Sequence, residues 1–151
     1  MRRRVLFTVM VFVAACGDGG PEPERFQGLW RLTSANVMPL PAAGNATAGE
    51  MWAAAVLQVT GETGFFDRCM RDPATSTLTS RSTPVVVGSI SDDRMTVSYF
   101  DRRESPPDTA TRDAERLTLR YRNTLTGQEG LDLLTFLPLE GALPGACSLV
   151  P

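Results

Sequence analysis

Apolar and polar residues alternate over several short stretches of the chain, a pattern typical of strands that bury one face. The clearest stretch is 116–122, where Leu117, Leu119 and Tyr121 alternate with arginine and threonine residues. Residues 85–87 and 131–139 are apolar almost throughout, as in strands that are covered on both faces. The pattern therefore predicts an all-β domain built from short strands.

Turn residues separate these stretches. Segments rich in glycine or aspartate occur at 60–64, 92–93 and 126–130, and their chemistry suits tight reversals of the chain. Short strands joined in this way predict an antiparallel β-barrel or sandwich, and we favour the barrel. The eight expected strands cover about residues 26–34, 52–60, 64–71, 76–82, 84–91, 94–102, 115–124 and 131–138.

Two segments allow other interpretations. Residues 47–50 have the pattern of a helix capping box and precede several good helix formers, so a short helix over 48–57 is one alternative. The other alternative is a strand, which we favour because the turn at 60–64 then makes a hairpin. The polar segment Asp101–Glu115 contains the pair Pro106-Pro107 and is expected to be an exposed, mobile loop.

The N-terminus has the features of an export signal. Three arginines, Arg2–Arg4, precede a short apolar run, which leads into Val13-Ala14-Ala15-Cys16. The apolar run is shorter than the roughly 20 residues of a transmembrane helix. An ordinary secretory signal with a chance cysteine at the cleavage site is one interpretation of these residues.

The closing tetrapeptide resembles the lipobox of bacterial lipoproteins. This resemblance implies a signal peptide at 1–15, a lipid on Cys16 and a lipidated N-terminal tether over 16–25. It also implies the outer membrane as the destination, because Gly17 stands where the retention signal of that family has an aspartate. The membrane is then a partner through Cys16, and residues 26–151 form a single folded domain.

Composition limits the chemistry of the processed chain. Of 15 basic and 17 acidic residues, three basic ones lie in the signal, which leaves 12 against 17 and argues against nucleic acid as a partner. The sequence contains no histidine, which excludes histidine-based catalysis and histidine metal ligands. Asp92 and Asp93 are adjacent and are read as turn residues. We expect no enzyme activity, no cofactor and no metal site.

Cys69 and Cys147 remain once Cys16 carries lipid. In an exported protein two such cysteines usually form a disulfide, which we expect here. The alternatives are two buried free thiols, or a two-cysteine metal site. A disulfide would pin the proline-containing C-terminal tail, Leu143–Pro151, against the body of the domain.

The segment Phe26-Gln27-Gly28-Leu29-Trp30 is similar to the entry motif of lipocalin (calycin) barrels. In that family the tryptophan closes the base of the barrel and packs under an arginine from a late strand. The resemblance implies a lipocalin-like barrel in which Trp30 is structural, with Phe26 and Leu32 on the same inner face. Arg120 or Arg122 would supply the arginine.

Two functions are expected on these grounds. The first is a membrane-anchored, non-catalytic barrel that holds a small hydrophobic ligand, with the Asp101–Glu115 loop as its lid. The alternative is a structural or assembly component of the cell envelope that acts through protein–protein contacts. A connected apolar cavity would favour the first function, and a solid core would favour the second.

Overall fold

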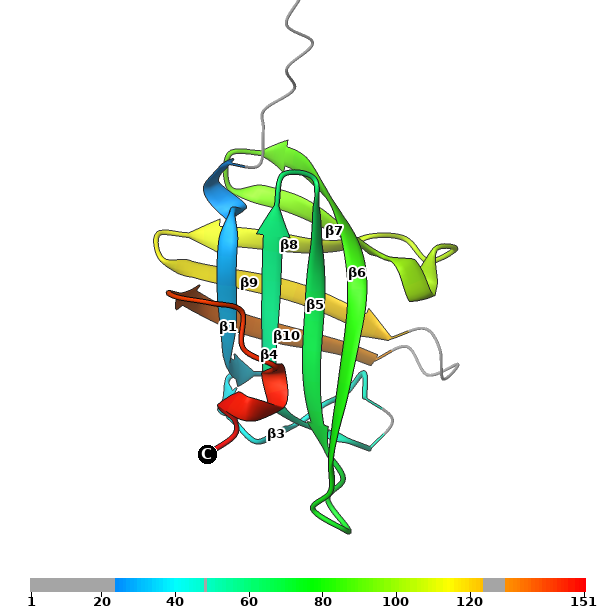
Figure 1. Cartoon of the computed structure of the whole chain (residues 1–151). Helices are drawn as coiled ribbons and strands as arrows, with labels where there is room; N and C mark the ends of the chain where they lie inside the picture. Colours follow the sequence, from blue (N-terminus) through cyan, green and yellow to red (C-terminus); the bar gives the residue numbers. More distant parts are fainter. Residues whose placement is uncertain (1–23, 48, 124–129) are drawn as a thin grey trace, which may run out of the picture.

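The computed structural model describes residues 24–47, 49–123 and 130–151. Regular structure in these residues is almost entirely strand (Figure 1). The strands are β1 (Gly28–Ala35), β2 (Met38–Pro39), β3 (Ala42–Ala43), β4 (Met51–Thr60), β5 (Thr63–Arg71), β6 (Leu78–Ser91), β7 (Arg94–Tyr99), β8 (Asp108–Asp113), β9 (Arg116–Asn123) and β10 (Gly130–Leu139). The same residues contain three short 3-10 helices: η1 (Glu24–Phe26), η2 (Phe100–Arg102) and η3 (Ala146–Leu149).

Eight strands form one closed antiparallel barrel, in the order β1-β10-β9-β8-β7-β6-β5-β4. The barrel closes because β1 pairs with β10 on one side and with β4 on the other. The two-residue strands β2 and β3 extend this sheet at one end, beside β1 and β4. The predicted all-β antiparallel barrel is confirmed. In the segment with two alternatives, β4 confirms the strand, so the helix over 48–57 is wrong.

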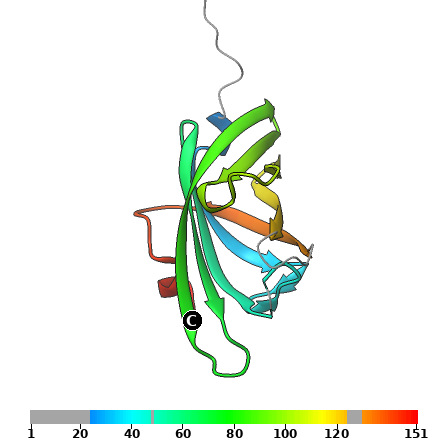
Figure 2. The same ribbon diagram turned by 90° about the vertical axis from the view of Figure 1, so that its right-hand side faces the viewer.

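Two of the expected strands are a single strand in the structure. The stretches 76–82 and 84–91 belong to β6, which is continuous through Pro84. Residues 78–86 pair with β5, whereas 85–91 pair with β7. Pro84 therefore lies where β6 changes partners, which is a place where a strand tolerates a missing amide hydrogen. The β5–β6 hairpin projects beyond the other strands at one end (Figure 1, Figure 2).

The segment Asp101–Glu115 is not a long loop, and that expectation is wrong. It contains β8, which pairs with β7 and β9 and is one of the barrel strands. The inward residues of β8 include Asp108 and Ala110, both buried. A charged side chain and a small one produce no apolar alternation, so the strand left no periodic signal in the sequence.

Aromatic side chains form the centre of the core. The Phe66 ring has four aromatic neighbours, with centroid distances of 6.2 Å to Trp52, 6.0 Å to Tyr99, 5.8 Å to Tyr121 and 6.3 Å to Phe136. All five side chains are buried and point into the barrel from different strands. Among the described residues, no helix is long and apolar enough to cross a bilayer.

Candidate functional site

Trp30 closes the end of the barrel where β1 begins, which we call the Trp30 end. Trp30 and Phe26 are 2% and 1% exposed, and the indole Nε1 donates a hydrogen bond to the Phe26 carbonyl at 2.8 Å. Leu32 is also buried and belongs to the same core cluster. The sequence interpretation of these three residues as inward-facing core is therefore confirmed. The segment from Phe26 to Trp30 therefore covers this end of the barrel.

The arginine beside Trp30 is Arg112 of β8. Its guanidinium carbon lies 5.2 Å from the centroid of the indole ring, a distance that suits a cation–π contact. Its Nη1 also donates to the carbonyl of Arg25. Arg120 and Arg122, which we expected in this role, are exposed on the outer face of β9, so that expectation is wrong. The error arises from the missed strand that carries Arg112.

A buried ion pair lies at the opposite end of the barrel, which we call the Arg102 end. Nη2 of Arg102 donates to Oδ2 of Asp108 at 3.3 Å, and the two side chains are 3% and 1% exposed. The guanidinium of Arg102 also lies 4.1 Å from the Tyr99 ring centroid and 4.7 Å from that of Tyr121. Two aromatic faces and one carboxylate therefore hold a cation that has almost no access to water.

Burial controls the acid–base properties of this cluster. Burial raises the pKa of the Asp108 carboxyl above its usual range, although Arg102 and the backbone amide of Arg122 oppose that rise. The pKa of Tyr99 lies well above its usual value, mainly because the hydroxyl is buried and next because Asp108 is nearby. Tyr99 is therefore neutral at physiological pH, and it is a poor candidate for proton transfer there.

Arg68 of β5 continues the polar cluster. It points inward and donates to the Tyr121 hydroxyl at 2.7 Å and to the Thr83 hydroxyl at 2.7 Å. Asp101 lies 3.5 Å away at the surface and completes an ion pair. The Arg68 side chain is only 12% exposed. The cluster links β5, β6, β9 and the β7–β8 connection.

Asp132 holds the connection between β1 and β4 against the Arg102 end. Its side chain is fully buried and accepts a hydrogen bond from Nδ2 of Asn36 at 2.6 Å. It also accepts from the backbone amides of Asn45 and Ala46, at 2.6 and 3.1 Å, and from the Trp52 indole at 3.0 Å. One carboxylate therefore fixes both the loop and a core tryptophan.

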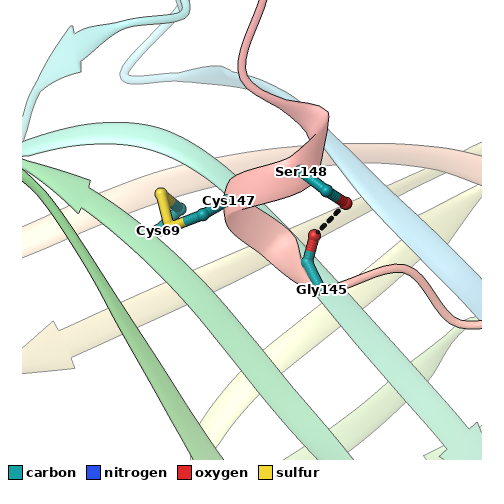
Figure 3. Close-up of a disulfide and its surroundings, with 4 residues drawn as sticks. All are labelled: Cys69, Gly145, Cys147 and Ser148. Carbon is teal, nitrogen blue, oxygen red and sulfur yellow. Dashed lines mark hydrogen bonds between the residues drawn. A yellow bond between two sulfur atoms is a disulfide. The ribbon is translucent and has the colours of Figure 1, made fainter.

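Cys69 and Cys147 form the predicted disulfide, with an S–S distance of 2.04 Å and α-carbons 4.9 Å apart (Figure 3). The alternatives of two free thiols or a two-cysteine metal site are therefore wrong. The bond fixes η3 on the outside of the barrel over β4 and β5 (Figure 1). Ala146 of η3 packs there against Ala53, Ala54 and Cys69 in a small apolar cluster separate from the main core.

A groove of about 580 Å³ lies outside the barrel, between the C-terminal residues and strands β1, β4 and β10. Leu137, Pro41 and Leu149 contribute apolar parts of its lining, and Arg31 and Arg71 contribute cationic ones. The Nε atom of Arg71 is buried and has no hydrogen-bond partner among the described residues. The groove can accept an apolar group that carries a negative charge.

The structure places the other residues singled out in the sequence as well. Cys16 and the predicted signal lie outside the described residues. Asp92 and Asp93 form the exposed turn between β6 and β7, as interpreted from sequence. The predicted lid does not exist as a loop, because β8 occupies it. Sequence reasoning missed Arg102, Asp108 and Asp132 as site residues; only Asp132 left a signal, as a charged residue at an inward position of an apolar strand.

Comparisons with known proteins add no family to these observations. No protein-family model, no curated protein and no solved structure matches the chain.

Proposed function

We propose that this chain is an exported lipoprotein, anchored through Cys16, whose barrel acts through contacts with other proteins of the cell envelope. The packing around Phe66 is the observation that favours protein–protein contacts over binding of a ligand inside the barrel. Phe66 reaches the middle of the barrel and has four rings around it at centroid distances between 5.8 and 6.3 Å. A ligand would need this space, so the interior serves as a rigid core.

Both ends of the barrel support the same proposal. Trp30 and Arg112 cover one end, and the Arg102–Asp108 pair lies across the other. Opening either end would separate an arginine from its aromatic or carboxylate partners. Eight-stranded barrels are narrow enough for side chains alone to fill them. We assign no catalytic activity, cofactor or nucleic acid to the domain.

The anchor rests on the resemblance of residues 13–16 to a lipobox. Two or more acyl chains hold a soluble domain stably on a bilayer, because each buried methylene contributes about 0.8 kcal/mol. We place the protein on the outer membrane, since Gly17 comes directly after Cys16. Cys16→Ser is expected to release the protein from the membrane fraction or to leave it unprocessed. A processed variant that still sediments with membranes would refute the anchor.

A second candidate function has the exterior groove in its favour. Its apolar lining and its two arginines, Arg31 and Arg71, suit a small hydrophobic ligand with a carboxylate. Such a ligand would bind against the outside of β1 and β10 rather than within the barrel. Arg71→Gln would then weaken binding of this ligand without disturbing the core.

A thermal-shift screen with fatty acids separates the two functions. For a domain that acts through protein contacts, we expect no shift in Tm at any fatty-acid concentration up to the solubility limit. Photo-crosslinking from exposed positions in intact cells is then expected to give one defined complex with another envelope protein. A concentration-dependent rise in Tm that Arg71→Gln abolishes would support the groove instead, because binding to the folded state alone raises its stability.

A further inference from the structure

We propose that the outer face of β9 and β10 docks on the anionic surface of the bilayer that holds the anchor. The proposal rests on the lipid anchor of the proposed function and adds a second, reversible contact with the same membrane. Its basis is a row of outward-facing leucines, two of them exposed, beside arginines on an otherwise acidic chain.

The leucine row results from the alternation of β10. Asp132, Leu134 and Phe136 point into the barrel and are buried, so the residues between them point outward. The outward positions carry four leucines, of which Leu133 is 42% exposed and Leu137 is 40% exposed. The four leucines are Leu131, Leu133, Leu137 and Leu139. The sequence had suggested a strand covered on both faces, and a closed barrel covers only the inner one.

The row continues into a hairpin tip. The backbone amide of Asn36 donates to the carbonyl of Leu133 at 2.8 Å, which places the β1–β2 turn beside the row. Val37 in this turn is 94% exposed, and Met38, the first residue of β2, is 60% exposed. Val37 also has a φ of 60°, a conformation that β-branched residues strongly disfavour. A side chain that is 94% exposed buries almost no apolar surface within the domain, and its position suits contact with acyl chains.

Arginines flank the leucines on both sides. On β9, Arg122 is opposite Leu131 and Arg120 is opposite Leu133. On β1, Arg31 is opposite Leu137. Two acidic residues lie near this face. Asp108 is buried, with its Oδ1 4.0 Å from Nε of Arg122, and Asp113 of β8 pairs in register with Arg116 of β9. The processed chain has 12 basic and 17 acidic residues, so this concentration of positive charge is local. Arginines beside exposed leucines match anionic headgroups above acyl chains.

The anchor lies within reach of this face. The described chain begins at Glu24, and Leu139 at one end of the row pairs with Leu29 of β1. The eight residues from Cys16 to Pro23 span at most about 28 Å when fully extended. Lipid on Cys16 therefore keeps the β10 face at a high effective concentration near the bilayer, which makes a weak surface contact sufficient.

Val86 provides a control position for Leu133 on another face of the barrel. Val86 of β6 is 42% exposed, the same fraction as Leu133. In register it faces Thr63 on one side and Ser98 on the other, so arginines do not flank it there. Strand β6 is four places from β10 around the barrel in either direction. Docking through β9 and β10 therefore points Val86 away from the bilayer.

Tryptophan fluorescence in the lipidated protein tests the orientation. Leu133→Trp and Val86→Trp each add one exposed indole, while the native Trp30 and Trp52 are 2% and 0% exposed and give a constant background. The proteins are reconstituted in phosphatidylglycerol vesicles with brominated or ordinary acyl chains. We expect bromine to reduce the emission added by Leu133→Trp about twofold and to leave that of Val86→Trp nearly unchanged.

Charge variants test the role of the arginines. Arg31→Gln combined with Arg120→Gln is expected to abolish the quenching of Leu133→Trp, as is high salt or replacement of phosphatidylglycerol by phosphatidylcholine. Arg94→Gln combined with Arg103→Gln removes the same charge from exposed positions on and after β7 and is expected to have no effect. Circular dichroism confirms that each variant keeps the fold.

The outcomes separate this proposal from the anchor itself. Lipidated protein in which Leu133→Trp is quenched no more than Val86→Trp would overturn the docking face and leave the anchor intact. Selective quenching in a protein whose mass shows no lipid would refute the anchor and support the face. Quenching that is indifferent to the arginine variants and to headgroup charge would overturn the electrostatic basis of the proposal.

Discussion

Asp108 and Arg102 form an ion pair inside one end of the barrel, with Oδ2 and Nη2 separated by 3.3 Å and side chains 1% and 3% exposed. Neither charge can be hydrated where it lies, so each depends on the other. Tyr99 and Tyr121 place their ring faces against the guanidinium and contribute a second favourable contact. The pair joins the 3-10 helix η2 to the first residue of β8 and thereby fixes the entry of that strand into the barrel.

Removing the cation is expected to destabilise the fold strongly. Arg102→Met leaves the Asp108 carboxylate buried without its partner, and breaking a buried pair in this way costs about 3–5 kcal/mol. The double variant Arg102→Met with Asp108→Asn is expected to lose less than the two single variants added together. Urea unfolding of the four proteins gives the coupling energy. Additive losses would mean that the two residues stabilise the fold independently.

Deletion of Pro106–Arg112 is expected to unfold the domain. The deletion removes most of β8, which pairs with β7 and β9, and it leaves both neighbours without a partner on one side. It also removes Asp108 and Arg112, which hold the two ends of the barrel. Circular dichroism and thermal melting check this result. A deleted protein with a nearly unchanged Tm would contradict the place of β8 in the barrel.

Hydrophobic alternation predicted most of the barrel because most inward residues are large and apolar. Leu117, Leu119 and Tyr121 of β9 are such a case, and all three are buried. The number of barrel strands was predicted correctly only because two errors cancelled: β6 was divided into 76–82 and 84–91, and β8 was missed. Periodicity cannot report a strand whose inward residues are an aspartate, an alanine and an arginine.

The polar clusters were harder to predict than the fold. In the sequence, an arginine and an aspartate that pair in the core look the same as charged residues in a solvated loop. Only the three-dimensional register of β8 shows that Arg102 and Asp108 meet. Asp132 is different, because it lies at an inward position two residues before Leu134. A carboxylate at such a position requires several donors, and sequence alone does not show that the distant Asn36 and Trp52 provide them.

Trp30→Ala is expected to cost about 3–5 kcal/mol, as other large truncations in protein cores do. The side chain is 2% exposed and its indole nitrogen is bonded to the Phe26 carbonyl, so truncation leaves both a cavity and an unpaired acceptor. Arg112→Gln removes the cation beside the ring and its hydrogen bond to the Arg25 carbonyl, and loss of the cation–π contact alone is expected to cost roughly 0.5–1 kcal/mol. Chemical unfolding measures both. A loss below about 1 kcal/mol for Trp30→Ala would show that this end of the barrel is not closed by packing.

Loss of the disulfide is expected to lower stability while leaving the barrel folded. Cys69 and Cys147 are 78 positions apart, and the loop-entropy model gives such a crosslink about 4–5 kcal/mol as an upper figure. The variant Cys69→Ala with Cys147→Ala is expected to release η3 from β4 and β5 and to expose Ala53 and Ala54. Hydrogen exchange localises that change. Protection lost throughout the barrel would instead mean that the crosslink supports the whole fold.

The contribution of Asp108 to stability is expected to fall as pH rises from about 4 through the raised pKa of its carboxyl. Burial raises the pKa of this carboxyl in the folded protein above its usual value of 3.8, so within that window the folded state binds more protons than the unfolded state. Each increase in pH then favours unfolding. Asp72 shifts in the opposite direction, because the backbone amides of Thr75 and Ala74 lower its pKa, and its contribution is lost only as pH falls.

Asp108→Asn isolates the contribution of Asp108, because Asp72 and the other carboxyls titrate in both proteins. The variant carries a neutral side chain at position 108 at every pH, so the way in which the stability difference between the two proteins changes with pH is the informative quantity. We expect the free energy of unfolding of the wild type, relative to the variant, to decrease as pH rises from 4 towards neutrality. Urea titrations at a series of pH values measure it. A difference that grows with pH would mean that the attraction of Arg102 outweighs burial and holds the carboxyl pKa below its usual value.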